Sequence, residues 1–255
     1  MKTPRALLIV IAATLFSFGI QPAFAAQAAA ARHSTAKPAA PAGPVFNHAL
    51  LHPALLKATA PAVFKVRLTT TRGDFVVEVH RDWAPLGADR FYNLVKNGYF
   101  NNASFFRVVY GFVAQFGLSP VPAVNAAWQH TEISDDPVKQ TNAEGTLTFA
   151  SRGPNTRTTQ LFINFGDNSR LDAMGFAPFG SVVEGMDVVD KIYPGYGESP
   201  RQDLLTDQGD TYVKANFPDI DKIKLARIVP LVAAVTHNAA GAKPAGKPAA
   251  KPAQK

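Results

Sequence analysis

The sequence predicts a mainly β fold, a closed antiparallel barrel of eight strands capped by two α-helices. Three observations lead to this fold class. Many short segments alternate Val, Ile or Phe with polar residues, as strands with one buried face do. Only two segments combine a helix start with an apolar run of helical length. Hydrophobic residues make up 47% of the 255 residues, which excludes a wholly disordered chain.

The predicted strands are short and are separated by turn-forming residues. The first two form a hairpin, because Thr71-Arg72-Gly73 supplies a turn between them. In the last strand apolar residues alternate with Lys and Arg, which indicates one buried and one exposed face. The strands are expected at residues 62–69, 74–80, 104–109, 112–116, 146–150, 160–164, 179–183 and 222–229.

The two predicted helices are expected to cover the openings of the barrel. The first begins at Pro85, whose fixed φ suits a first helical turn, and it ends at Asn97-Gly98. Its apolar stripe runs from Phe91 to Val95. The second helix is expected at residues 185–192.

The chain divides into four segments of different composition. They are a signal peptide at residues 1–25, an Ala/Pro-rich linker at 26–45, a folded domain at 46–230 and a disordered Lys/Pro/Ala tail at 231–255. The folded domain is nearly neutral, because the excess of basic residues lies in the two ends. No nucleic-acid partner is therefore expected, since a nucleic-acid-binding domain carries its basic patch on the fold. The chain has no cysteine, which excludes disulfides and thiolate chemistry.

The first 25 residues have the pattern of a secretory signal. Lys2 and Arg5 precede an uncharged apolar run at residues 6–20, and Ala23-Phe24-Ala25 supplies a cleavage site. We expect an exported protein of the periplasm or cell envelope, with no stable membrane insertion once the signal is removed. An uncleaved anchor is the alternative, although the apolar run is shorter than a membrane-spanning helix requires.

The tail repeats Lys-Pro-Ala, beginning at Lys243, Lys247 and Lys251. Spaced prolines prevent a stable helix, and alanine alone cannot form a core. The tail is expected to be solvated. The alternative is a weak contact of its basic residues with anionic polymers of the envelope.

Common catalytic motifs are missing from the sequence. It contains no HExxH, no Gly-x-Ser-x-Gly and no phosphate-binding glycine loop. Asp135-Asp136 is a carboxylate pair between prolines, which we interpret as solvated loop charge. We therefore expect neither a metal nor a cofactor.

A set of linked motifs in the middle of the chain is more specific. The motifs are Phe105-Phe106-Arg107-Val108-Val109, Gly111-Phe112-Val113-Ala114-Gln115, Phe149-Ala150-Ser151, Gln160-Leu161-Phe162-Ile163-Asn164, Leu171-Asp172 and Gly175-Phe176-Ala177-Pro178-Phe179-Gly180. Their order, spacing and residue types resemble the cyclophilins, the cyclosporin-binding family of peptidyl-prolyl isomerases, in their bacterial exported form. The resemblance extends from about Val63 to Ile192.

This resemblance implies an enzyme with a cyclophilin-like barrel, and it implies the role of individual residues. Arg107 and Gln115 would be catalytic. The residues that would bind the substrate are Phe112, Val113, Ala150, Ser151, Gln160, Phe162, Leu171 and Phe176. The partners implied are proline-containing polypeptides, and no cofactor is implied.

The residue types agree with isomerisation of the peptide bond before proline. That bond rotates over a barrier of roughly 18–20 kcal/mol, which comes from amide resonance. A guanidinium that donates to the prolyl nitrogen stabilises the twisted state, in which this nitrogen has left the resonance. Arginine suits the task because it stays charged and its donors are fixed in a plane.

The sequence departs from the family pattern at four positions. Ser151 replaces an Asn that holds the substrate backbone, and Arg170 replaces an aromatic residue at the rim. Phe176 aligns with the pocket histidine of many eukaryotic members. Phe116 follows Gln115 where Gly is usual, and its ring is expected to narrow the groove.

Two long stretches exceed the common family core. They are residues 120–139, interpreted as a loop that carries Trp128, and residues 194–221, and no chemistry is assigned to either. The alternative function is a non-catalytic chaperone that binds proline peptides on the same fold. It would be favoured if Phe116 or the Trp128 loop filled the pocket beside Arg107. A structural envelope protein that acts through its tail is the third hypothesis.

Overall fold

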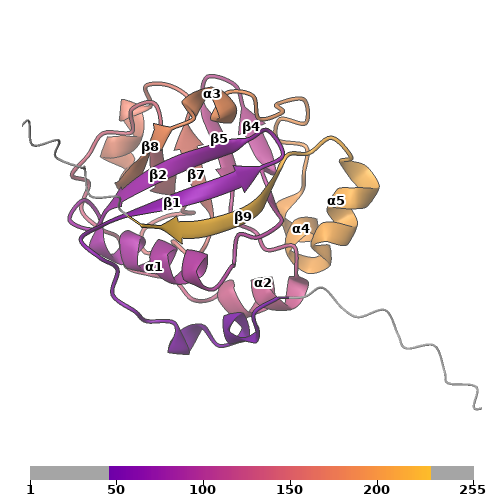
Figure 1. The fold of residues 1–255 in the computed structure, drawn as a ribbon, viewed down its shortest axis with the longest axis horizontal. Helices are drawn as coiled ribbons and strands as arrows, with labels where there is room; N and C mark the ends of the chain where they lie inside the picture. The colour runs from indigo at the N-terminus through magenta and orange to yellow at the C-terminus, as the bar shows by residue number, and fades with distance from the viewer. Residues whose placement is uncertain (1–45, 231–255) are drawn as a thin grey trace, which may run out of the picture. The chain divides into compact units, whose positions relative to one another are not determined.

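The computed structural model describes residues 46–230, drawn in colour in Figure 1. The predicted signal peptide, linker and tail lie outside these residues. The strands are β1 (Val63–Thr70), β2 (Asp74–His80), β3 (Ala103–Ser104), β4 (Arg107–Val109), β5 (Val113–Phe116), β6 (Thr146–Phe149), β7 (Leu161–Asn164), β8 (Pro178–Glu184) and β9 (Lys222–Val229). The α-helices are α1 (Pro85–Lys96), α2 (Pro122–Trp128), α3 (Met186–Val189), α4 (Gln202–Gln208) and α5 (Asp210–Asn216). The 3₁₀-helices are η1 (His48–Leu51), η2 (Pro53–Leu55) and η3 (Ser169–Met174).

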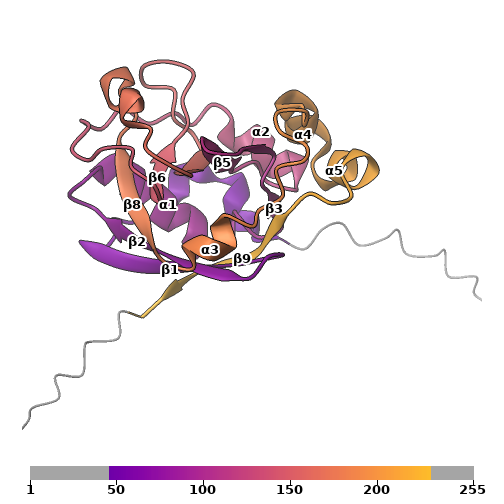
Figure 2. The same ribbon diagram turned by 90° about the horizontal axis from the view of Figure 1, so that it is seen from above.

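The nine described strands form one antiparallel sheet in the order β3-β9-β1-β2-β8-β6-β7-β5-β4. The sheet curls into a half-barrel, seen from above in Figure 2. The prediction of a mainly β, antiparallel fold is confirmed. The prediction of a closed, eight-stranded barrel is wrong, both in the number of strands and in the closure.

Both errors have their origin in the stretch predicted as a single strand at residues 104–109. In the structure its first part, β3, pairs with β9, and its second part, β4, pairs with β5. The two aromatic residues between these parts, Phe105 and Phe106, are buried in different hydrophobic clusters. In the described sheet β3 and β4 are the two edge strands, and they do not pair with each other. The sheet is therefore open, and only the covalent chain between Ser104 and Arg107 connects its two edges.

The main hydrophobic core fills the inside of the curled sheet. In β1 every second side chain is buried, including Phe64, Val66 and Leu68. Helix α1 closes one side, where Phe91 packs on Phe179 of β8 with ring centroids 5.3 Å apart. The period of two along the strands therefore determines which residues form the core.

The helices agree only in part with the prediction. Helix α1 begins at Pro85 as predicted, whereas the second predicted helix is shortened to α3. The stretch 120–139, interpreted as a loop, contains α2. The stretch 194–221, to which no element was assigned, contains α4 and α5. In both stretches short helices of about two turns alternate with loops, a pattern with little helical periodicity to detect.

Helices α4 and α5 build a second hydrophobic cluster on the outside of the sheet. Phe106 and Leu118 belong to this cluster together with Leu205 of α4 and Tyr212 of α5. The ring of Phe217 completes the cluster and meets Tyr212 edge-on at 5.4 Å. The 194–221 segment is therefore packed against the residue that precedes Arg107.

Asp136 is buried, so the interpretation of the Asp135-Asp136 pair as solvated loop charge is wrong for this residue, whereas Asp135 is exposed. Its two carboxylate oxygens accept the backbone N–H groups of Leu86 and Gly87, at 3.0 and 2.9 Å, in the first turn of α1. The guanidinium of Arg157, also buried, contacts the same carboxylate at 3.1 Å. Asp136 therefore caps α1 and neutralises a buried cation.

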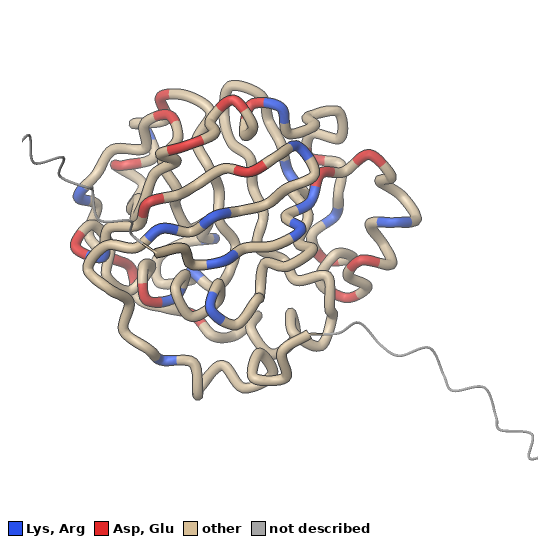
Figure 3. The backbone as a smooth tube through the Cα atoms, in the orientation of Figure 1, with Lys and Arg blue, Asp and Glu red and all other residues tan. Residues whose placement is uncertain are grey.

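Charged residues of both signs are interspersed along the described backbone, as Figure 3 shows. This agrees with the near-neutral charge of the domain in the sequence. Within residues 46–230, no helix has the length and apolar composition needed to cross a bilayer.

The Asp136 cap predicts a measurable loss of stability. Replacing Asp136 with Asn removes the buried counter-charge of Arg157 and leaves only the exposed Asp135, at 3.3 Å, so we expect the free energy of unfolding to fall by about 2–4 kcal/mol. Urea unfolding of the mature protein measures the change. The control is Asp187→Asn, which removes an exposed pair with Lys191 and should change little. Equal effects of the two substitutions would contradict the cap.

Candidate active site

The candidate site lies on the outer face of three neighbouring strands, β4, β5 and β7. Arg107 of β4 is paired with Gln115 of β5, and Gln115 is paired with Phe162 of β7. Directly paired residues of antiparallel strands project to the same face of the sheet. Their neighbours in the chain, such as Ala114 and Ile163, project into the main core. The strand register therefore gathers a cation, an amide and an aromatic ring on one surface.

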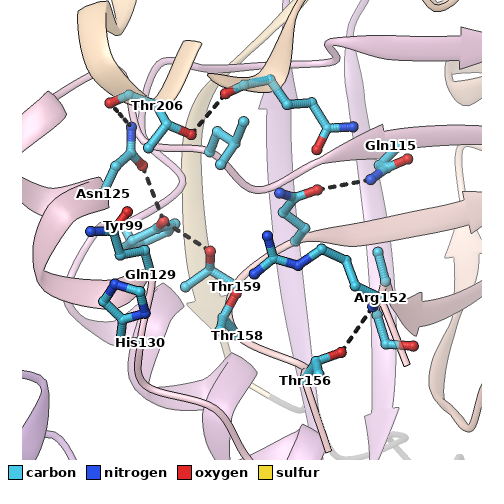
Figure 4. Close-up of a pocket in the computed structure, with 15 residues that line it drawn as sticks. Tyr99, Gln115, Asn125, Gln129, His130, Arg152, Thr156, Thr158, Thr159 and Thr206 are labelled. Carbon is cyan, nitrogen blue, oxygen red and sulfur yellow. Dashed lines mark hydrogen bonds between the residues drawn. The ribbon is translucent and has the colours of Figure 1, made fainter. Parts of the chain in front are cut away.

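Hydrogen bonds join the polar side chains of this surface into a row. Arg107 Nη1 donates to Gln115 Oε1 at 3.4 Å, and Gln115 Nε2 donates to Gln160 Oε1 at 2.9 Å. The second bond is drawn in Figure 4, where the labelled Gln115 points towards its partner. Gln115 is buried, whereas the side chain of Arg107 is 26% exposed. The guanidinium is therefore accessible while its partner is fixed.

The residues of the predicted apolar pocket lie together beside this row. They centre on a cluster of Val113, Phe162 and Leu171, which are all buried. Partly buried residues packed on this cluster are Phe112, Ala150 and Phe176. The guanidinium carbon of Arg107 lies 5.4 Å from the ring centre of Phe112, so the charge borders the pocket.

Buried polar side chains hold the walls of the pocket in place. Asn168 Nδ2 donates to the carbonyl of Phe112 at 2.9 Å, and Asn142 Nδ2 donates to the carbonyl of Phe176 at 2.9 Å. Asn142 Nδ2 also donates to Asp172 of η3 at 2.7 Å. These bonds attach η3, which carries Leu171, to the sheet.

Asp172 is the only ionisable group in this anchoring set. Burial opposes the ionisation of its carboxyl, but hydrogen bonds from Thr141 and Asn142 outweigh that effect, and the pKa of Asp172 lies below its ordinary value. The carboxylate form is therefore favoured in the folded protein.

A cavity of about 320 Å³ adjoins the row and shares Ala150 with the apolar pocket. It contains four of the predicted site residues, Gln115, Ala150, Ser151 and Gln160. Figure 4 shows the residues that surround it, with Tyr99, Asn125, Gln129, His130 and Arg152 labelled. Burial raises the pKa of Tyr99, so its phenol stays protonated and donates to Thr159 Oγ1 at 3.1 Å. The row therefore adjoins both the apolar residues and a polar cavity.

All ten predicted site residues lie around this surface. Arg107, Gln115 and Gln160 form the row, and Ala150 and Ser151 line the cavity. The apolar pocket contains the others, which are Phe112, Val113, Phe162, Leu171 and Phe176. Their catalytic and binding roles stay predictions.

The expectation that Phe116 narrows the groove is wrong. Its side chain is fully buried in the main core, where it meets Phe100 and Phe105 edge-on at 5.6 and 5.4 Å. The alternation along β5 places it on the opposite face from Gln115. Trp128 is also buried in the core and donates its Nε1 proton to the carbonyl of Leu50 at 2.8 Å. Neither ring fills the pocket beside Arg107.

Two features of the site were missed in the sequence. Glu198, from the segment between α3 and α4, accepts a hydrogen bond from Arg107 Nε at 2.6 Å. Gln202 and Thr206 of α4 form part of the wall of the polar cavity. No local signal identifies these residues, because Glu198 follows Arg107 by 91 positions.

Within residues 46–230, no three His, Asp or Glu side chains gather as metal ligands.

Comparisons with known proteins agree with the geometry of the site. The model of the family described as cyclophilin type peptidyl-prolyl cis-trans isomerase/CLD matches residues 65–207. A peptidyl-prolyl cis-trans isomerase of Acinetobacter baylyi is 37% identical over 146 residues, which cover 54% of this chain and 76% of that protein. Peptidyl-prolyl cis-trans isomerase B of Escherichia coli is 34% identical over 142 residues, which cover 50% of this chain and 82% of that protein.

Solved structures show the same fold. The crystal structure of a cyclophilin type peptidyl-prolyl cis-trans isomerase of Cryptosporidium parvum has a TM-score of 0.52 at 22% identity, covering 66% of this chain and 98% of that one. The same protein crystallised in the presence of the dipeptide Ala-Pro has a TM-score of 0.51 at 21% identity, covering 65% of this chain and 99% of that one.

Asp172 predicts a pH-dependent stability of the pocket. Because the pKa of this carboxyl is lowered in the folded state, its contribution is complete above the unfolded value of about 3.8 and is lost as the pH falls through the folded value. We expect Asp172→Asn to destabilise the protein at pH 7. The difference in unfolding free energy from the wild type should disappear at low pH. Urea unfolding at several pH values measures it, and a difference that is constant with pH would contradict the assignment.

Proposed function

This chain belongs to the cyclophilin-type peptidyl-prolyl cis-trans isomerases, and on that premise we propose how it acts. Arg107 accelerates rotation about Xaa-Pro bonds by donating a hydrogen bond to the prolyl nitrogen. The proline ring lies in the apolar pocket, and the substrates are exported proteins. The position of a partly exposed guanidinium at the edge of a buried apolar pocket supports this mechanism.

The reaction requires that the amide nitrogen leave its resonance with the carbonyl group. In the planar ground state this nitrogen is a poor acceptor, and in the twisted state it recovers a lone pair. A donor aimed at the nitrogen therefore binds the transition state more strongly than the ground state, which is the condition for catalysis. Turnover in milliseconds needs an acceleration of about 10⁴-fold, or about 5.5 kcal/mol. A charged hydrogen bond beside an apolar surface, together with orientation of the substrate, is of the right size.

The apolar pocket fixes the position of the ring. Val113, Phe162 and Leu171 offer only hydrocarbon surface, which suits the three methylene groups of proline and excludes water from the bond that rotates. The C. parvum protein crystallised in the presence of Ala-Pro supports this class of ligand.

The polar groove holds the substrate backbone. Gln160 lies at the end of the row that begins at Arg107, and Ala150 and Ser151 line the adjoining cavity. The residue before proline lies along Ala150 and Ser151, while Gln115 and Gln160 bind its backbone and orient Arg107. With the backbone fixed on one side of the bond, rotation is confined to the other side.

Arg107→Ala tests the mechanism. Prolyl cis-trans exchange by NMR on a short Ala-Pro peptide should be accelerated by the mature protein, and the variant should lower kcat/KM by about a hundredfold, as removal of a transition-state donor does. The matched control is Arg67→Ala, which removes an exposed arginine that pairs with Asp74 on the hairpin of β1 and β2. It should leave the exchange rate unchanged.

Two results would contradict the proposal. Activity that survives in Arg107→Ala would exclude the arginine mechanism. A wild-type protein that binds the peptide without accelerating exchange would instead be the non-catalytic chaperone on the same fold.

The export of the protein is a separate proposal, which the signal-like pattern of residues 1–25 supports. Expression of the full chain in a Gram-negative host should yield a periplasmic protein whose N-terminal sequence begins near Ala26. The control is Lys2→Glu/Arg5→Glu, which removes the positive charges before the apolar run and should slow export. Recovery of the uncleaved wild-type chain in the cytoplasm would contradict the proposal.

A further inference from the structure

Glu198 contacts the guanidinium of Arg107 from outside the strands that form the site. Its Oε1 accepts from Arg107 Nε at 2.6 Å and also contacts Nη2. Gln115 accepts from Nη1 at 3.4 Å, a long distance for a hydrogen bond. The contact with Glu198 is therefore the shorter of the two, and it joins oppositely charged groups.

The backbone around Glu198 is attached to the strand that carries Arg107. Val108 of β4 donates its backbone N–H to the carbonyl of Gly197 at 3.1 Å. Gly197 has a φ of +51°, in the left-handed region that a glycine adopts without strain. The segment thus occupies a hydrogen-bonding position on β4, the last strand of the sheet, immediately beside Arg107.

An aromatic anchor holds the other side of the same segment. Tyr196 meets Phe217 edge-on at 5.0 Å and Tyr193 edge-on at 5.3 Å. It packs against the second hydrophobic cluster, to which Phe106 also belongs. Phe106, next to Arg107, and Tyr196, close to Glu198, therefore pack on the same cluster. This packing holds the two backbone segments that carry the Arg107–Glu198 pair.

The contacts with Glu198 and Gln115 leave two N–H donors of the guanidinium available. A guanidinium has five N–H donors in a plane. Glu198 takes the edge formed by Nε and Nη2, and Gln115 takes one donor of Nη1. One N–H on each of Nη1 and Nη2 then has no partner among the described residues. A ligand can accept from these two donors while both protein contacts persist.

We propose that Glu198 is a positioning residue that holds the guanidinium of Arg107 with these two donors available to the substrate. The inference rests on the proposed role of Arg107. The carboxylate is 65% exposed, so water screens its charge and the donors of Arg107 keep most of their strength. The main effect of Glu198 is on orientation. Because the guanidinium is already held in place, Arg107 loses less conformational entropy when it binds the twisted peptide bond. The 194–221 segment thereby takes part in catalysis without contacting the reacting atoms.

The kinetic test compares three variants in the peptide exchange experiment. Glu198→Ala should lower kcat about two- to fivefold and change KM less, as expected for an exposed charged contact that acts on orientation. Glu198→Gln should retain most of the activity, because an amide oxygen accepts the same N–H groups. The control is Asp203→Ala, which removes a carboxylate of similar exposure that pairs with Arg201 on the same segment. It should have no effect on kcat.

A spectroscopic readout tests the contact without using activity. The Nε–H signal of Arg107, assigned by its absence in Arg107→Lys, should show slow exchange with water in the wild type. Exchange should be fast in Glu198→Ala and unchanged in Asp203→Ala. Thermal unfolding of each variant shows whether the fold is retained.

The possible results are distinguishable. If Arg107→Ala is inactive but Glu198→Ala keeps or exceeds the wild-type kcat, the positioning role of Glu198 is excluded and the arginine mechanism stands. If Arg107→Ala retains its activity, the proposed mechanism fails, and the positioning role fails with it. Equal Nε–H exchange in the wild type and Glu198→Ala would also exclude the positioning role.

Discussion

The register of β4, β5 and β7 is the constraint on which the candidate site depends. Pairing of Arg107 with Gln115, and of Gln115 with Phe162, places the three side chains on the outer face. Because side chains alternate with a period of two, a slip by one residue would bury a guanidinium in the core and expose core residues such as Phe116. The free energy that such a slip would cost keeps the strands in this register. The hydrophobic core therefore determines where the polar chemistry of the site lies, although the two share no side chain.

The edge of β4 is the weak point of this arrangement, and the 194–221 segment covers it. An edge strand presents unpaired backbone groups that invite other chains. Here the carbonyl of Gly197 accepts from Val108, and α4 and α5 bury Phe106 in the second cluster. The same segment brings Glu198 to Arg107 and forms part of the wall of the polar cavity. One segment thus protects the edge, completes the packing and borders the site.

Sequence reasoning identified the parts of the site that are close in the chain or lie on regular strands. Arg107 and Gln115 were identified together by the resemblance to the family, and the pairing of β4 with β5 places them on one face. The buried polar network was not predicted, because Asn142 and Asp172 are brought together by η3 and loops that have no periodic pattern. Asp136 was misread since its partners, α1 and Arg157, are far from it in sequence. The division of residues 104–109 into β3 and β4 was also missed, because an apolar run does not reveal which partner each half pairs with.

The central claim is that the prolyl nitrogen meets Arg107 while the ring occupies the apolar pocket. A crystal structure of the mature protein with a short Ala-Pro peptide tests this most directly. The account predicts the ring against Val113, Phe162 and Leu171, with a nitrogen of Arg107 facing the prolyl nitrogen within about 3.5 Å, near hydrogen-bond reach. A ring bound in the polar cavity, or a prolyl nitrogen turned away from Arg107, would contradict it.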